Sequence, residues 1–205
     1  FHTIYFPGPP NIEPATLNPS RFQPPLRFGF TNSVGRHWGM GFLLEAWRHA
    51  KIPPEAAVLD LFIYPGYGIL PIQQGFGDLV RSGGVVIREE RIGGREEEIY
   101  ARMSARVVSA LWEVNSPDLS MLARRVPVLA PRQSAFREAF SDGENAFFYE
   151  RGDVGSLASL LRRLALDPAL LKTAAENCLM GVRFSRESFA DNLLALYQKV
   201  LATRR

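Results

Sequence analysis

Short apolar runs alternate with longer amphipathic segments from residue 26 to the C-terminus. The apolar runs predict buried strands at residues 26–30, 58–64, 85–88, 106–111, 126–130 and 147–149. The amphipathic segments predict helices at about residues 40–49, 75–82, 95–104, 119–125, 154–166, 168–182 and 188–203. Strands that alternate with helices predict an α/β fold, a doubly wound, Rossmann-like parallel sheet of about six strands flanked by helices.

The N-terminal part of the chain is rich in proline. Seven of the first 25 residues are proline, which removes backbone donors and disfavours helix. We therefore predict that residues 1–25 form an extended connector that lies on another part of the protein. Residues 26–186 are expected to form the α/β domain, and residues 187–205 the last helix. The apolar residues on one face of that helix are Phe189, Leu193, Leu196, Tyr197 and Val200.

Composition and charge narrow the class of protein only a little. The 205 residues are 46% hydrophobic and 22% charged, which is ordinary for a soluble globular protein. The net charge of +3 is too small for a nucleic-acid-binding protein, and it mildly favours anionic ligands such as phosphates. The single cysteine, Cys178, excludes an internal disulfide and predicts a small buried residue. No apolar run approaches the ~20 residues that span a bilayer.

Sheets of this kind bind ligands beyond the carboxyl ends of their strands. The segments that follow the main predicted strands are residues 31–39, 65–68, 89–94, 111–118 and 130–135. These segments are where functional residues are expected. No cluster of histidine, cysteine and acidic residues has the spacing of a metal site, and the glycines that follow the first strand lack the spacing of a dinucleotide fingerprint.

Six short motifs follow one another along the predicted domain. They are Trp38-Gly-Met-Gly-Phe-Leu-Leu-Glu-Ala-Trp47, Leu61-Phe-Ile-Tyr-Pro-Gly-Tyr-Gly68, Glu98-Ile-Tyr-Ala-Arg-Met-Ser-Ala-Arg-Val-Val108, Ala123-Arg-Arg-Val-Pro-Val128, Glu138 to Ala146, and Phe184 to Tyr197. Their order resembles the C-terminal, donor-binding domain of GT-B glycosyltransferases, nearest to the retaining family 4, or glycosyl transferases group 1. The resemblance implies transfer of a sugar from a nucleotide-diphosphate sugar, with no metal or other cofactor.

The resemblance implies two acidic positions in the donor site. In the family, a loop glutamate lies by the donor sugar, and a second glutamate at the start of the next helix holds the donor ribose. Counted back from Pro127, the second position falls on Ser120, which can hydrogen-bond a ribose but cannot supply a charge-assisted bond. Ser120 is equally compatible with capping the helix. Glu113 is the candidate for the first role, and Asp118 is a candidate for a displaced carboxylate.

The family also neutralises the departing diphosphate with an arginine and a lysine from its first loop. Those positions fall near Ser33 and on Trp38 in this chain. Arg36 and His37 lie in the same loop and could reach the phosphates from shifted positions. Gly35 would let the backbone approach the phosphates closely. The alternative is that the arginine and the histidine are ordinary solvated loop residues.

Further positions of the candidate donor site come from the same resemblance. Arg91 and Ile92 lie where the family reads the nucleotide base, largely through backbone groups. Tyr64 and Gly66 belong to the turn after the second strand, where the tyrosine either contacts a base or sugar or packs. Gly39 would also let the backbone come close to the ligand.

We therefore predict a glycosyltransferase of the hexosyltransferase type in carbohydrate biosynthesis, with Glu113 and Arg36 as catalytic residues. The alternative is a catalytically degenerate GT-B domain that acts as an interaction or regulatory module. Its support is that Ser33, Trp38 and Ser120 replace three charged residues of the family. The chain begins with Phe1, and we expect it to be a piece of a longer protein.

The expected partners follow from the resemblance. They are a nucleotide sugar, an acceptor that is a glycan, a lipid or a small molecule, and a missing N-terminal GT-B domain or partner chain. The prolines of residues 1–25 would form the interdomain connector, and the helix in residues 187–205 would pack on the missing domain. No nucleic acid is expected. The expected location is the cytoplasm, at the inner membrane surface if the acceptor is lipid-linked.

Overall fold

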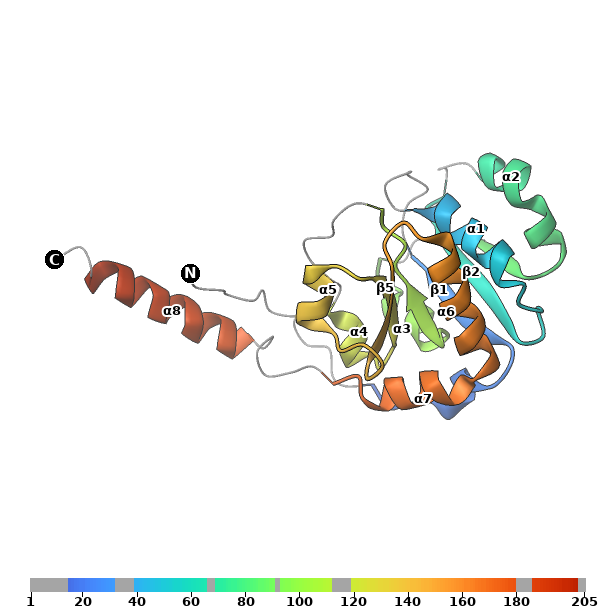
Figure 1. Cartoon of the computed structure of the whole chain (residues 1–205). Helices are drawn as coiled ribbons and strands as arrows, with labels where there is room; N and C mark the ends of the chain where they lie inside the picture. Colours follow the sequence, from blue (N-terminus) through green and yellow to red (C-terminus); the bar gives the residue numbers. More distant parts are fainter. Residues whose placement is uncertain are drawn as a thin grey trace.

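The structure is a computed structural model of the 205-residue chain. It describes residues 15–31, 39–65, 69–90, 93–111, 119–179 and 186–202. The described strands form one sheet, and helices lie on both of its faces (Figure 1).

The sheet in the described part of the chain has six strands. They are β1 (Leu26–Phe30), β2 (Ala57–Ile63), β3 (Val85–Glu89), β4 (Ala105–Val107), β5 (Val128–Pro131) and β6 (Ala146–Tyr149). Their order is β3-β2-β1-β4-β5-β6, and each neighbouring pair of these strands is parallel. This arrangement confirms the predicted Rossmann-like, doubly wound sheet.

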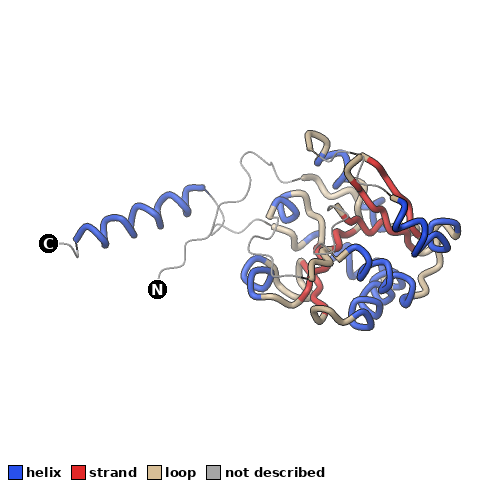
Figure 2. Tube along the Cα trace, turned by 90° about the horizontal axis from the view of Figure 1, so that it is seen from above, coloured by secondary structure: helices blue, strands red, loops and turns tan. Residues whose placement is uncertain are grey.

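Along the chain, helices lie before, between and after the strands (Figure 2). They are the 3₁₀-helix η1 (Pro19–Phe22) and the α-helices α1 (Met40–Ala50), α2 (Leu70–Arg81), α3 (Glu96–Ala101), α4 (Ser120–Ala123), α5 (Ser134–Ala139), α6 (Val154–Leu166), α7 (Pro168–Glu176) and α8 (Arg186–Ala202). The side chain of Asp153 accepts a hydrogen bond from the backbone N–H of Ser156 at 2.9 Å and so caps the start of α6.

Alternation along β1 separates two hydrophobic cores. Leu26, Phe28 and Phe30 are fully buried and belong to the core that contains the inner faces of α1 and α6. Gly29, which points the other way, lies so close to Met103 that a Cβ would fall 2.3 Å from the Met103 sulfur. Met103 belongs to the second core, under α3, α4 and α5. Both faces of this strand are therefore buried, as expected for a central parallel strand.

Several element ends differ from the predicted ones. α2 begins at Leu70 rather than residue 75, because Pro71 in its first turn is compatible with a helix start. β4 ends at Val107 rather than residue 111, although the N–H of Val108 still donates to Leu129 O. α7 ends at Glu176, well before residue 182. For β4 and α7, the apolar pattern continues past the point where the regular element ends.

The proline-rich segment is partly folded onto the domain. Pro19 starts the short helix η1 (Pro19–Phe22), so the prediction of an extended chain is wrong for these four residues. The N–H of Ala15 donates to Ala123 O at 2.9 Å. Arg125, whose backbone is left-handed with a φ of 53°, donates from Nε to Ala15 O at 3.0 Å and from Nη1 to Glu176 O at 3.2 Å. The side chain of Arg125 thus forms hydrogen bonds with both the start of the described chain and the end of α7.

Helix α8 lies apart from the rest of the described residues in both views (Figures 1 and 2). None of its described residues is buried, and Leu194, Tyr197 and Leu201 are more than half exposed. A helix of this length with exposed apolar side chains on it has surface for packing against another body.

Candidate functional site

The order of the strands reverses between β1 and β4. From β1 the chain goes outward to β2 and β3, and it then returns to the other side of β1 to form β4, β5 and β6. Connections at such a point leave in opposite directions, and this opens a crevice above the carboxyl ends of the two strands. Thr31, directly after β1, and residues 108–111, after β4, lie at this point. This crevice is the candidate site.

Gly39 holds the start of α1 against the end of β4. It is the N-cap residue of α1 and has a left-handed backbone, with a φ of 70°. A Cβ at this position would lie 1.8 Å from the carbonyl oxygen of Ser109, so only glycine fits. The N-terminus of an 11-residue helix, which carries a partial positive charge, is therefore fixed at the crevice. The close approach at Gly39 is to the protein backbone, and the expectation that Gly39 lets the backbone come close to a ligand stays a prediction.

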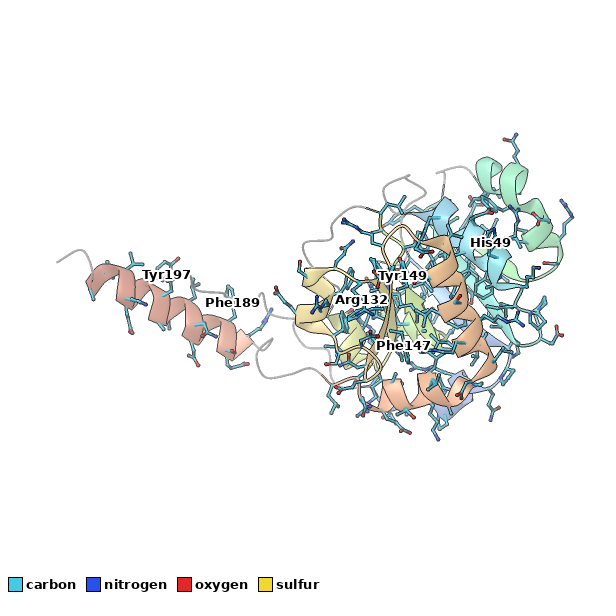
Figure 3. The ribbon with its side chains drawn as sticks, viewed as in Figure 1. His49, Arg132, Phe147, Tyr149, Phe189 and Tyr197 are labelled. Carbon is cyan, nitrogen blue, oxygen red and sulfur yellow. The ribbon has the colours of Figure 1, made fainter. Side chains whose placement is uncertain are left out.

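A buried tyrosine fixes the backbone after β4. The hydroxyl of Tyr149 donates to the carbonyl oxygen of Val108 at 2.8 Å. Burial raises the pKa of Tyr149, so the phenol stays neutral and remains a donor. The Tyr149 ring also stacks on Phe42 of α1, with ring centroids 6.1 Å apart. Figure 3 shows Tyr149 inside the domain, where it links β6, α1 and the rim of the crevice.

The carboxyl end of β5 carries an arginine that is already paired. Arg132 donates from Nε to Glu150 at 3.0 Å and from Nη2 to Asp142 at 2.9 Å. These carboxylates, Asp142 first, raise the pKa of Arg132. Figure 3 shows this arginine beside β5. With two acids on one guanidinium, Arg132 contributes no surplus positive charge for a phosphate.

The Asp-Gly-x-Asn-Ala motif is a structural turn before β6. Asp142 Oδ1 accepts from the N–H of Phe148 at 2.9 Å, and Asn145 Oδ1 accepts from the N–H of Ser141 at 2.9 Å. Gly143 between them has a left-handed backbone, with a φ of 78°. The aspartate, glycine and asparagine of this motif therefore have structural roles in the turn, and no ligand is required to explain them.

Two of the predicted site residues lie within the described part of the chain. Tyr64 directly follows β2 and is 45% exposed. Ser120 is the first residue of α4 and is 5% exposed. The N-cap position of α4 is Leu119, so the expectation that Ser120 caps this helix is wrong.

The other predicted site residues lie outside the described residues. They are Gly35, Arg36, His37, Gly66, Arg91, Ile92, Glu113 and Asp118. Their roles therefore remain predictions. The same holds for Ser33 and Trp38, which occupy the family's charged positions.

Sequence reasoning did not single out Thr31, the residue directly after β1. Its hydroxyl oxygen is buried and makes no hydrogen bond with the part of the chain that the structure describes. A threonine that directly follows a buried central strand is the signal that could have identified it.

A separate cavity of about 460 Å³ lies between α2 and the edge strand β3. Val80, Val85 and Ile87 make part of its lining apolar, and Glu89 is the acidic residue in the lining. An acidic residue without a basic one in the lining is unsuited to a diphosphate. The crevice at the strand reversal therefore remains the better candidate for an anionic ligand.

Three further features of the described residues bear on possible functional sites or membrane segments. Within them, no group of three or more histidine, cysteine or acidic side chains could hold a metal ion. The buried Asp60 lies mid-strand in β2, where Arg27 and Arg88 bind it. A search of the described helices finds none long and apolar enough to cross a membrane.

Solved structures provide the comparisons. No family model and no curated protein matches the sequence. HepE from Anabaena, solved with UDP and glucose, aligns over 84% of this chain and 48% of that chain, at a TM-score of 0.67 and 16% identity. A glycosyltransferase from Rickettsia africae aligns over 96% of this chain and 56% of that chain, at a TM-score of 0.71 and 14% identity.

A third structure is a C-terminal domain alone. It belongs to LpcC, a glycosyl transferase group 1 family protein from Francisella tularensis, and aligns over 82% of this chain and 91% of that domain, at a TM-score of 0.64 and 18% identity. The chain spans about half the length of HepE. At identities of 14–18%, these likenesses establish the fold alone. The chain therefore has the Rossmann-like α/β fold that these glycosyltransferase structures contain.

Proposed function

We propose that this chain is the donor-binding half of a glycosyltransferase that takes a sugar from a nucleotide-diphosphate sugar. The observation that carries the proposal is the crevice between β1 and β4, with the N-terminus of α1 fixed at its edge by Gly39. A helix N-terminus at such a point suits the phosphates of a nucleotide. The likeness to HepE, which was solved with UDP-glucose, supports the same class of donor.

The proposed chemistry needs stabilisation of the departing nucleoside diphosphate. The backbone N–H groups at the start of α1 supply part of it, and Arg36 supplies the positive charge. Glu113 lies by the donor sugar in this proposal. Base and ribose are bound by Tyr64, Gly66, Arg91, Ile92, Asp118 and Ser120, while Gly35 and His37 line the phosphates. The proposal includes a hexosyl donor, retention of configuration and no metal or other cofactor.

The acceptor site belongs to a second body in this proposal. The described helices and strands supply one Rossmann-like domain, and the chain spans about half the length of HepE. Residues 1–25 would lead from the missing N-terminal domain, and residues 187–205 would pack on it through the exposed apolar side chains of α8. The acceptor would be a glycan, a lipid or a small molecule, in cytoplasmic carbohydrate biosynthesis.

A non-catalytic module is the second candidate. Ser120 stands where the family has a ribose-binding glutamate, and it is neutral and almost fully buried. A buried hydroxyl makes a weaker bond to a ribose than a carboxylate does. This observation favours a degenerate domain that binds another protein.

A thermal-shift screen of the 205-residue chain separates the two candidates. The ligands are UDP, GDP, ADP, TDP and their common sugar conjugates. A ligand that binds only the folded state stabilises it by about 2.7 kcal/mol at a hundredfold excess over the Kd. A selective rise in melting temperature with one base supports the enzyme and identifies the donor class. No rise with any of them, at millimolar ligand and with folding verified, contradicts the enzyme and favours the module.

A further inference from the structure

Thr31 lies at the strand reversal by the register of the sheet. β1 pairs with β4 at Phe28–Ala105 and at Gly29–Arg106. Two further steps along both strands bring Thr31 level with Val108. The next residue is Ser109, whose carbonyl oxygen faces Gly39. Thr31 thus belongs to the same rim of the crevice as the start of α1.

The backbone groups opposite Thr31 already make contacts with other residues. The N–H of Val108 donates to Leu129 O at 2.8 Å, and the carbonyl oxygen of Val108 accepts from the Tyr149 hydroxyl. The Ser109 carbonyl is packed against Gly39. With these groups engaged elsewhere, the buried Thr31 hydroxyl makes no hydrogen bond with the described residues.

A buried hydroxyl without a partner destabilises a protein, whereas a valine of nearly the same shape at the end of a strand would not. Such groups persist where a ligand, ion or water supplies the missing partner. The Thr31 hydroxyl is therefore available as a donor to a ligand. Thr31 lies at the same strand reversal as the N-terminus of α1, whose partial positive charge favours an acceptor with negative charge.

We propose that the Thr31 hydroxyl donates a hydrogen bond to a phosphate oxygen of a bound nucleoside diphosphate. This inference rests on the proposed function and adds a binding residue to the donor site. Because a hydroxyl is neutral, Thr31 orients the diphosphate through a hydrogen bond but does not neutralise its charge. It holds the diphosphate at the amino end of α1, and a cation is still needed to neutralise it.

The test compares Thr31→Val with Thr31→Ser in the 205-residue chain. Affinities for UDP, GDP, ADP and TDP are measured by isothermal titration calorimetry, and melting temperatures are measured without ligand. Thr31→Val should weaken the diphosphate that the wild-type chain prefers by about tenfold, the effect expected of one hydrogen bond to a charged group. Thr31→Ser keeps the hydroxyl and should stay within about threefold of wild type. The free Thr31→Val protein should melt at the same temperature or higher, because it lacks the unpaired hydroxyl.

The control is Thr173→Val, which removes an exposed hydroxyl from α7 and should change neither the affinity nor the preferred base. If Thr31→Val does not fold, Thr31→Ala removes the same hydroxyl with less bulk and takes its place. Unchanged affinity in a folded variant overturns the role of Thr31 while the proposed function stands. Failure of the wild-type chain to bind any of the four diphosphates overturns both.

Discussion

The backbone of Gly39 lies against the carbonyl oxygen of Ser109 so closely that no side chain fits between them. Gly39 begins α1, and Ser109 follows β4, so this contact joins the two sides of the strand reversal. The candidate site therefore depends on a contact between two backbones, which only a glycine permits.

Gly39→Ala should destabilise the chain and displace the start of α1. The added Cβ would meet the Ser109 carbonyl at 1.8 Å, and the left-handed backbone is unfavourable for alanine. We expect a loss of about 2 kcal/mol or more in the free energy of unfolding, measured by urea denaturation. Gly41→Ala is the control, because among the described residues nothing lies within 4 Å of its Cβ. That variant should gain about 0.5–1 kcal/mol, since α1 then has a better helix former. Equal effects at the two positions would contradict the role of Gly39.

Asp60 should be needed for the stability of the sheet. It is 2% exposed, and Arg27 of β1 and Arg88 of β3 bind it at 2.7 Å and 2.8 Å. Asp60→Ala leaves two arginines without their carboxylate, and we expect a loss of about 2–4 kcal/mol, because both arginines keep some contact with water. Asp78→Ala removes the exposed ion pair between Asp78 and Arg48; the Asp78 carboxylate is 55% exposed, so this change should destabilise the chain much less. The free energy of unfolding of both variants is measured by urea denaturation. Similar losses in the two variants would contradict a special role for Asp60.

Tyr149→Phe should weaken both stability and ligand binding. The lost hydroxyl leaves the Val108 carbonyl without its buried donor, and the expected loss is about 1–2 kcal/mol. The segment after β4 also borders the crevice, so affinity for the preferred nucleoside diphosphate should fall. Tyr197→Phe, on the exposed α8, is the matched control and should leave both properties unchanged. If Tyr149→Phe loses stability but keeps its affinity for the diphosphate, Tyr149 does not support the binding site.

Cys178 should stay unreactive in the folded chain. It is 1% exposed, and burial raises the pKa of its thiol to about 12. A group with a raised folded-state pKa contributes stability below its unfolded pKa of about 8.5 and loses it as pH rises toward the folded value. The melting temperature of the wild-type chain should therefore fall between pH 8 and pH 11, and it should fall less in Cys178→Ala. A thiol reagent at pH 8 should modify the wild-type chain only on unfolding, and rapid modification of the folded chain would contradict this.

The fold could be predicted because its strands are buried on both faces. The apolar runs at residues 26–30 and 126–130 stand out because Pro25 directly precedes the first and Pro131 directly follows the second. The reversal of strand order then follows from the connectivity of α/β units. The ends of β4 and α7 could not be predicted, because Val108 and Cys178 continue the apolar pattern although the regular element has ended.

The site was less predictable, because tertiary contacts define it. The bond from Tyr149 to Val108 joins residues 41 positions apart. The pattern around Thr31 does not reveal that its hydroxyl lacks a partner, since that depends on where Val108 and Ser109 are already engaged. The resemblance predicted ligand residues by position in the loops. It could not predict which backbone contacts hold those loops in place.

Arg36→Ala provides the sharpest test of the phosphate-binding role that the resemblance assigns to the first loop. Arg36 lies outside the described residues, so its role is a prediction from sequence alone. Removal of a cation that contacts the diphosphate should weaken binding of the preferred nucleotide sugar by about tenfold or more. Arg204→Ala removes the same charge near the C-terminus and should have no such effect. The two variants have equal net charge, so a difference between their affinities, measured by calorimetry, reports a local contact and not a general electrostatic change. Equal affinities in the two variants would remove Arg36 from the donor site and leave the amino end of α1 as the remaining source of positive charge.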